Sequence, residues 1–276
     1  MNEALLDWFA GNRRELEVRE TVDPWATLVA EVMSHQTQIR RVGPAWAAFV
    51  RRWATPAALA EAPTDELLRA WAGLGYNRRA IALREAARHI VTEHRGEVPR
   101  DVEALERLPG VGPYTARAVA ASAFGTPVAP LDVNVTRVVA RVLGQARPGG
   151  SLQVAADRLV LREDPRRWLH AVMDLAASVC TRREPRCSAC PIAAFCASAG
   201  TAGETPGRGT REAPFTHTRR WLRGRIVARL REASAGAWLD FDEPIGTHAV
   251  AEVTAALDGL AADGFVETEG TRARLR

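Results

Sequence analysis

The chain has 276 residues, of which 47% are hydrophobic and 25% are charged, and its formal net charge is +4. This composition is typical of one large or two modest globular domains and argues against an intrinsically disordered chain. Every basic residue is an arginine, which excludes a mechanism that needs a lysine amine, such as a Schiff base, unless the N-terminus serves. We expect neither a secretory signal nor a membrane span. Charges lie among the first residues, and the longest uncharged apolar run, 118–131, is broken by Gly125 and Pro127.

Apolar residues recur at helical spacing along most of the chain up to residue 198. In the segment 23–39, Asp23 can cap a helix, Pro24 suits its first turn, and the apolar positions from Trp25 to Met33 form one stripe. Further helices are predicted over 45–53, 64–72, 79–93, 101–107, 114–124 and 135–143. Strand-like alternation is nearly absent, so we predict an all-α body with short Gly/Pro turns.

The composition changes after Ser198. Residues 199–214 are rich in glycine, threonine and proline and are interpreted as a linker. The remaining segment, 215–276, is predicted to hold a basic helix over 219–232, a second helix and a short hairpin. Helix, helix and hairpin indicate a small winged-helix-like module, and a plain packing appendage is the alternative.

All four cysteines lie in one short loop, with the spacing C-x6-C-x2-C-x5-C, at Cys180, Cys187, Cys190 and Cys196. A secreted disulfide scaffold would spread its cysteines along the chain. Four thiolates from one compact loop suit a [4Fe-4S] cluster, whereas zinc usually takes two separate knuckles. The spacing therefore favours a cluster over zinc. The loop also carries three arginines that would either donate to phosphate or form a solvated basic face: Arg182, Arg183 and Arg186.

A second motif, L-P-G-V-G-P-Y-T-A, occupies residues 108–116. Gly110 and Gly112 flank Val111 between two predicted helices and indicate a tight hairpin. Free backbone N–H groups at the start of the second helix, near Thr115, would form an anion site suited to a DNA phosphate. A helix rather than a strand precedes the glycines, so this is not a dinucleotide-binding fingerprint. Alone, the pair indicates only a turn.

The hairpin, the sequence L-D-V-N-V-T-R-V at 131–138 and the cysteine loop, in this order, resemble the helix-hairpin-helix DNA glycosylases of the endonuclease III superfamily. Three further segments, 30–38, 71–80 and 173–180, are similar to signatures of the adenine-specific (MutY-type) branch. The resemblance covers roughly residues 5–198. We expect the larger C-terminal domain that reads 8-oxoguanine in many adenine glycosylases to be absent.

The resemblance implies an all-α, two-lobed helix-hairpin-helix glycosylase fold with a [4Fe-4S] loop and a C-terminal winged-helix-like appendage. The expected parts are a cluster lobe from 1–21 and 136–198, a six-helix lobe with the hairpin from 22–135, the linker 199–214 and the module 215–276. We expect a monomer that acts on double-stranded DNA containing a mismatched or damaged base. Its expected location is the bacterial cytoplasm, in association with the nucleoid and not with a membrane.

Four residues match the family's catalytic positions. Asp132 would stabilise an oxocarbenium-like sugar, although it is also placed to cap the next helix, and Asn134 would lie close to it. Glu31 matches the acid of the adenine branch and would protonate a purine if burial raised its pKa, whereas most helix glutamates are solvated. Tyr114 stands where endonuclease III-type enzymes have their Schiff-base lysine. This implies a monofunctional enzyme that leaves an abasic site.

The resemblance also assigns residues to base recognition and to duplex distortion. Arg19 and Asp174 match residues that line the base pocket. Gln36 and Tyr76 match residues that wedge into the duplex beside the extruded nucleotide.

Several positions depart from the family pattern. Val18 replaces a tryptophan, Ser34 and His35 replace leucine and glutamine, and Asn77 replaces a second tyrosine. These changes cluster around the expected base pocket and wedge and make the pocket more polar. They lead to the hypothesis that the excised purine is hypoxanthine rather than adenine.

The leading interpretation is a purine-specific, monofunctional DNA glycosylase of base excision repair. It would remove adenine opposite 8-oxoguanine or guanine, or hypoxanthine. A thymine glycosylase acting on T:G mismatches is the second interpretation, because that branch also carries tyrosine at the position of Tyr114. A non-catalytic, cluster-bearing DNA-binding module is the third, and the presence of both Glu31 and Asp132 argues against it.

Overall fold

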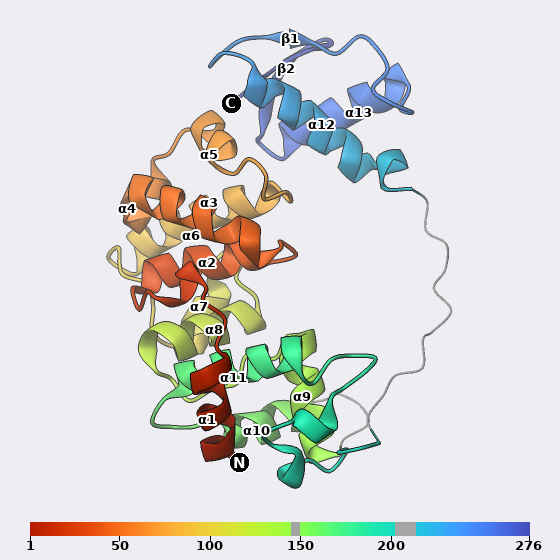
Figure 1. The fold of residues 1–276 in the computed structure, drawn as a ribbon. Coiled ribbons are helices and arrows are strands. Elements are labelled where there is room, and N and C mark those ends of the chain that lie inside the picture. The colour runs from red at the N-terminus through yellow and green to blue at the C-terminus, as the bar shows by residue number, and fades with distance from the viewer. Residues whose placement is uncertain (145–149, 202–213) are drawn as a thin grey trace. The chain divides into compact units, whose positions relative to one another are not determined.

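The computed structural model describes residues 1–144, 150–201 and 214–276, and it is predominantly helical (Figure 1). Contacts divide the chain into two compact units, a first unit of Met1–His35 with Glu97–Arg208 and a second unit of Gln36–Gly96 with Gly209–Arg276. This division differs from the expected parts, because the C-terminal module shares a unit with 36–96. Most of the predicted linker lies outside the described residues.

The first unit is built around α11, the last of its helices in chain order among the described residues. This helix packs against α1, α8 and α9. Trp168 and Leu175 of α11 are buried with Leu5 of α1 and Val139 of α9. The helix α2 packs against α8. The helices are α1 (Asn2–Asn12), α2 (Pro24–Ser34), α7 (Val102–Arg107), α8 (Pro113–Phe124), α9 (Val133–Leu143), α10 (Gly150–Leu159) and α11 (Pro165–Ser178). Short 3-10 turns lie at Glu17–Arg19, Cys187–Ala189 and Ala193–Phe195.

Aspartate N-caps start α2, α7, α9 and α11 of this unit. Asp23 accepts a hydrogen bond from the Ala26 N–H at 2.7 Å, as the sequence predicted. An Asp-Pro pair also starts α11, which the sequence analysis missed. The C-terminal end of the helix predicted over 23–39 was wrong. The helix α2 ends at Ser34, because His35 leaves the helical conformation, with ψ 114°, and Gln36 has a left-handed backbone with φ +53°.

The second unit combines helices from the middle of the chain with the C-terminal module. Its helices are α3 (Ile39–Arg52), α4 (Pro56–Ala60), α5 (Thr64–Ala70) and α6 (Arg78–Glu93), followed by a 3-10 turn (Phe215–His217), α12 (Arg219–Glu232) and α13 (Val250–Ala262). Three strands, β1 (Leu239–Asp240), β2 (Val266–Glu269) and β3 (Arg272–Leu275), form an antiparallel sheet in the order β1-β3-β2. The predicted helix–helix–hairpin module is confirmed, with β1 as an added strand.

The C-terminal module packs on α5. Leu68 of α5 is buried in the same cluster as Ile226 of α12 and Phe265, and the Asp65 N–H donates to the Arg276 carbonyl at 2.8 Å. Along the described residues, no helix combines the length and apolar character needed to cross a bilayer.

Candidate functional site

Three helices of the first unit present the candidate catalytic side chains. Glu31 lies on α2, Tyr114 on the first turn of α8, and Asp132 is the N-cap of α9. The Asp132 carboxylate accepts from the backbone N–H groups of Asn134 at 2.9 Å and Val135 at 2.7 Å, and from the Asn134 amide at 2.9 Å. The expected cap is therefore confirmed, and it fixes the orientation of the carboxylate.

The Glu31 carboxyl lies in a desolvated position beside Tyr114. Burial raises its pKa from 4.5 to about 7, the charge of Asp132 adds to this, and a hydrogen bond with Tyr114 and the charge of Arg19 oppose it. Burial and the neighbouring carboxylates raise the pKa of the Tyr114 hydroxyl well above its ordinary value. Tyr114 thus stays neutral and can donate to Glu31, which can carry or release a proton near neutral pH.

Asp174 occupies a different electrostatic setting in the same unit. Its side chain is only 1% exposed and accepts from Arg14 Nε at 2.6 Å, Arg19 Nη1 at 2.9 Å and Arg19 Nη2 at 2.9 Å. Burial alone would raise the pKa of Asp174, but the hydrogen bonds from Arg19 and Arg14 outweigh it and lower that pKa. The sequence analysis missed Arg14, whose only signal was its position in the basic pair before the Arg19 segment.

A hollow of about 540 Å³, partly open to solvent, adjoins these arginines. Its lining includes His170, two acidic residues, two apolar residues and five arginines, namely Arg13, Arg14, Arg19, Arg166 and Arg167. Burial, followed by the charges of Arg19 and Arg166, lowers the pKa of His170 to about 3, so its imidazole is neutral. No motif or spacing in the sequence points to His170, because its surroundings come from distant segments.

The residues that depart from the family pattern form hydrogen bonds with neighbouring residues or lie in a turn. The Ser34 hydroxyl donates to the Ala30 carbonyl at 2.7 Å, and His35 Nε2 shares a 2.8 Å hydrogen bond with the buried Thr115 hydroxyl. Val18 lies in the 3-10 turn that leads to Arg19. Asn77, in the second unit, accepts from Arg231 at 2.8 Å.

The predicted hairpin joins α7 to α8. The Val111 N–H donates to the Leu108 carbonyl at 3.0 Å, and Gly110 adopts a left-handed φ of +76°. Gly112 is the N-cap of α8 and Pro113 its first residue. The wedge candidates, Gln36 and Tyr76, belong to the second unit, and both have left-handed backbones, with φ of +53° and +46°.

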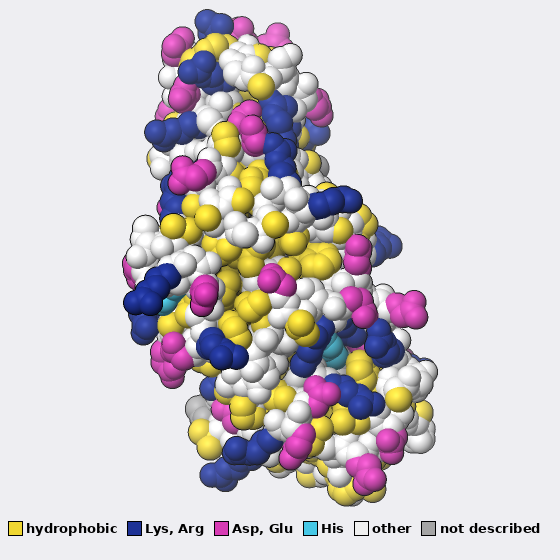
Figure 2. Space-filling model, turned by 90° about the vertical axis from the view of Figure 1, so that its left-hand side faces the viewer, with side chains coloured by type: hydrophobic (Ala, Val, Ile, Leu, Met, Phe, Trp, Pro, Cys, Tyr) yellow, Lys and Arg dark blue, Asp and Glu magenta, His cyan; other side chains and the backbone are white. Residues whose placement is uncertain are grey.

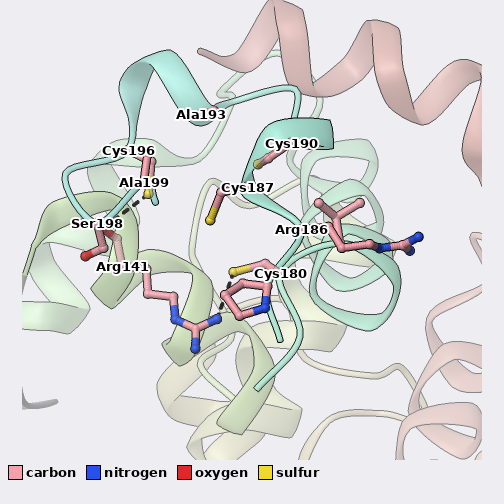
Figure 3. A pocket seen from close by; sticks show the side chains of 11 residues that line it. Arg141, Cys180, Arg186, Cys187, Cys190, Ala193, Cys196, Ser198 and Ala199 are labelled. Carbon is pink, nitrogen blue, oxygen red and sulfur yellow. Dashed lines mark hydrogen bonds between the residues drawn. The ribbon is translucent and has the colours of Figure 1, made fainter. Parts of the chain in front are cut away.

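The four cysteines surround one hollow (Figure 3). Arg141 donates to Cys180 Sγ at 3.4 Å and to the Thr181 carbonyl at 2.7 Å, and burial raises the pKa of the Cys190 and Cys196 thiols. Within the described ranges, no three His, Cys, Asp or Glu side chains are placed to share a single metal ion.

A side-chain relay links the cysteine loop to the candidate catalytic residues. Arg137 of α9 donates to the Cys180 carbonyl at 2.9 Å and to the Asn134 side chain at 3.1 Å, and Asn134 in turn contacts Asp132. Among the loop arginines, Arg182 and Arg183 lie in the described loop, and the Arg186 guanidinium points away from the hollow to the Ser178 carbonyl (Figure 3).

Comparison with known proteins agrees with this architecture. Residues 29–155 match the family described as "HhH-GPD superfamily base excision DNA repair protein". The chain is similar to an adenine DNA glycosylase of Mycobacterium tuberculosis, with 43% identity over 95% of this chain and 88% of the relative. It is also similar to a thymine-DNA glycosylase of Aeropyrum pernix, with 36% identity over 70% of this chain and 91% of the relative.

Solved structures give the same picture. The structure of a thermostable thymine-DNA glycosylase matches with a TM-score of 0.68 and 30% sequence identity. The match covers 71% of this chain and 93% of that chain. The structure of an endonuclease III–DNA covalent intermediate matches with a TM-score of 0.60 and 27% sequence identity. This match covers 72% of this chain and 93% of that chain. The mycobacterial match must also include most of the C-terminal module. The chain therefore belongs to the HhH-GPD superfamily and is a DNA glycosylase of base excision repair.

Proposed function

We propose that the protein is a monofunctional DNA N-glycosylase that removes a mispaired or damaged purine. The observation that carries this proposal is the Glu31 carboxyl, whose pKa is raised to about 7 beside Tyr114 and Asp132. A purine leaves a deoxyribose readily only when a ring nitrogen is protonated, and an acid with a pKa near the working pH is suited to that task.

The chemistry follows from the positions of these groups. With the target nucleotide extruded, protonated Glu31 transfers its proton to the base, while Tyr114 holds the Glu31 carboxyl in place. The Asp132 carboxylate, fixed by Asn134 and Val135, stabilises the oxocarbenium-like sugar as the glycosidic bond breaks. Water then adds to the sugar and leaves an abasic site.

The sequence supplies no lysine amine for strand cleavage. Tyr114 stands where a Schiff-base lysine would stand, and its neutral phenol cannot form an imine. The product strand should therefore stay intact until alkali is added.

The four cysteines would hold a [4Fe-4S] cluster. Four thiols around one hollow match its donor set, and their spacing within one compact loop favours a cluster over zinc. When bound, the cluster would cross-link the loop. Arg141 and Arg137 would then hold that loop against α9, next to Asp132.

The proposed DNA contacts come from several elements. The α7–α8 hairpin, with Gly110, Val111, Gly112 and Thr115, offers backbone donors to a phosphate. Gln36 and Tyr76 form the wedge beside the extruded nucleotide, Asn77 is a further DNA contact, and Arg182, Arg183 and Arg186 supply charge. We propose double-stranded DNA as the partner and a monomer as the active form.

The target base is tested by single-turnover excision on four duplexes. They contain adenine opposite 8-oxoguanine, adenine opposite guanine, hypoxanthine opposite thymine, and thymine opposite guanine, each assayed with and without alkali. Purine excision that needs alkali for strand cleavage supports the proposal. Excision of thymine alone supports the second candidate, which the 36% identity to a thymine-DNA glycosylase favours.

The departures from the family pattern make the proposed base pocket more polar. We therefore expect hypoxanthine to be the excised base. Arg19 and Asp174, together with Val18, Ser34 and His35, would line the base pocket. A Val18→Trp, Ser34→Leu double variant should then shift the preference from hypoxanthine towards adenine. An unchanged preference would contradict this reading of the pocket.

A further inference from the structure

Aromatic rings and guanidinium groups alternate in a row on the second unit. Arg79 lies 5.5 Å from the Trp71 ring centre and 5.6 Å from that of Tyr76, and Arg220 lies 5.0 Å from Tyr76 and 4.8 Å from Phe215. We call Trp71, Arg79, Tyr76, Arg220 and Phe215 the aromatic–arginine row. Trp71 is fully buried, whereas Tyr76 is 41% and Phe215 52% exposed. The row thus runs from the core to solvent.

The exposed end of the row is built by the C-terminal module. Arg220 of α12 donates to the Tyr76 hydroxyl at 2.6 Å, and Arg231 of the same helix donates to the Asn77 side chain at 2.8 Å. These two arginines are eleven positions apart, close to three full turns, so they share one face of α12. That face therefore contacts the wedge candidate Tyr76 and its neighbour Asn77.

The segment 73–76, which ends in the wedge candidate Tyr76, has a backbone conformation that its neighbours must support. Gly73, Gly75 and Tyr76 all have left-handed backbones, and a bulky residue holds φ +46° only when its surroundings enforce it. Trp71 Nε1 donates to the Gly75 carbonyl at 3.1 Å, and Arg79 donates to the same carbonyl at 3.0 Å. These contacts fix the backbone, whereas Arg220 contacts the Tyr76 side chain.

We propose that the C-terminal module is part of the DNA-binding surface. Arg220 is a positioning residue that holds the Tyr76 ring in place, and Phe215 extends the stacking surface that this unit offers to the duplex. This inference rests on the proposed glycosylase function. Exposed aromatic rings stack on any base, and nearby arginines neutralise phosphates, so duplex DNA is the partner whose chemistry fits the row.

The modest net charge of +4 does not select this surface by itself. On the face drawn in Figure 2, basic and acidic side chains are interspersed. The row is distinguished instead by its local alternation of rings and guanidinium groups, which a solvated basic helix face would not require.

The test compares Arg220→Ala with Arg229→Ala. Arg229 is an exposed arginine of the same helix that lies 4.9 Å from the Phe241 ring within the module, so the control matches charge and setting. We expect Arg220→Ala to weaken binding to a duplex with a stable abasic-site analogue about tenfold, and Phe215→Ala about fivefold. Arg229→Ala should stay within about twofold of wild type.

Two readouts separate positioning from a plain charge contact. The first readout is the fluorescence of 2-aminopurine placed beside the analogue, because this fluorescence reports unstacking of the base. It should fall with Arg220→Ala and not with Arg229→Ala. In a Tyr76→Ala background, Arg220→Ala should have no further effect, because its action passes through the ring. Thermal unfolding of each variant checks that the module remains folded.

Equal behaviour of the two arginine variants would overturn the inference, as would a full Arg220→Ala effect in the Tyr76→Ala background. The experiment also distinguishes failure of this inference from failure of the proposed function. A wild-type protein that excises no base contradicts the proposed function, whereas normal excision together with an unaffected Arg220→Ala variant contradicts this inference alone.

Discussion

Glu31 and Asp174 are two acidic side chains of the same compact unit, and their pKa values move in opposite directions. Both lose solvent, but Glu31 has one hydrogen-bonding tyrosine and a neighbouring carboxylate, whereas Asp174 has two arginines aimed at its oxygens. Burial raises the pKa of both acids; at Glu31 it prevails, whereas at Asp174 the arginine donors outweigh it and keep the carboxylate charged.

Removing the proposed acid should have the largest effect. Glu31→Gln keeps the shape of the side chain and removes the transferable proton, so single-turnover purine excision should fall about 10²–10⁴-fold. Binding to the abasic-analogue duplex is the control and should change by less than about threefold. Excision within about tenfold of wild type would remove Glu31 from the mechanism.

Removing the structural anion should act on folding instead. Asp174→Asn leaves Arg19, whose side chain is 10% exposed, without its counter-charge. The free energy of unfolding should drop by about 3 kcal/mol, measured by urea denaturation at pH 7. The matched control is Glu20→Gln, which breaks the exposed Arg13–Glu20 pair and should cost less than about 1 kcal/mol. Equal losses would mean that Asp174 does not organise this cluster.

The pH dependence of stability should sharpen the comparison. Because folding raises the pKa of Glu31, the native state binds this proton more tightly, and its contribution to stability falls as pH rises from 4.5 to about 7. Glu31→Gln should therefore raise the free energy of unfolding by about 1–3 kcal/mol at pH 8 and by little at pH 4. Asp174 has the opposite sign, and its contribution is lost only as the pH falls below the normal aspartate range. Equal Glu31→Gln effects at both pH values would contradict the raised pKa.

The smallest expected effect concerns Tyr114. Tyr114→Phe removes a hydrogen bond that lowers the pKa of Glu31, so the alkaline limb of the excision profile should move to higher pH. The rate at neutral pH should change by less than about tenfold. A shift to lower pH would show that the hydroxyl stabilises the protonated acid instead.

The sequence predicted the parts of this molecule that depend on short-range signals. The hairpin glycines, the Asp132 cap and the cysteine spacing are all read from neighbouring residues, and each has its expected place in the fold. Helix ends were less certain, since the left-handed turn at Gln36 has no glycine to mark it.

The contacts that the sequence analysis missed join distant segments. Arg14 and Asp174 are 160 residues apart, and Arg220 and Tyr76 are 144 apart. No periodicity or spacing connects such pairs, because their proximity is created by packing between helices. The C-terminal module was recognised from its elements, but its attachment to α5 and to the wedge segment emerged only from the fold.

The pH profile of single-turnover purine excision tests the central claim most directly. With Glu31 as the proton donor, the rate should be constant below about pH 7 and fall about tenfold per pH unit above it, and Glu31→Gln should abolish this dependence. A wild-type rate that stays flat or rises between about pH 7 and pH 9 would contradict the account.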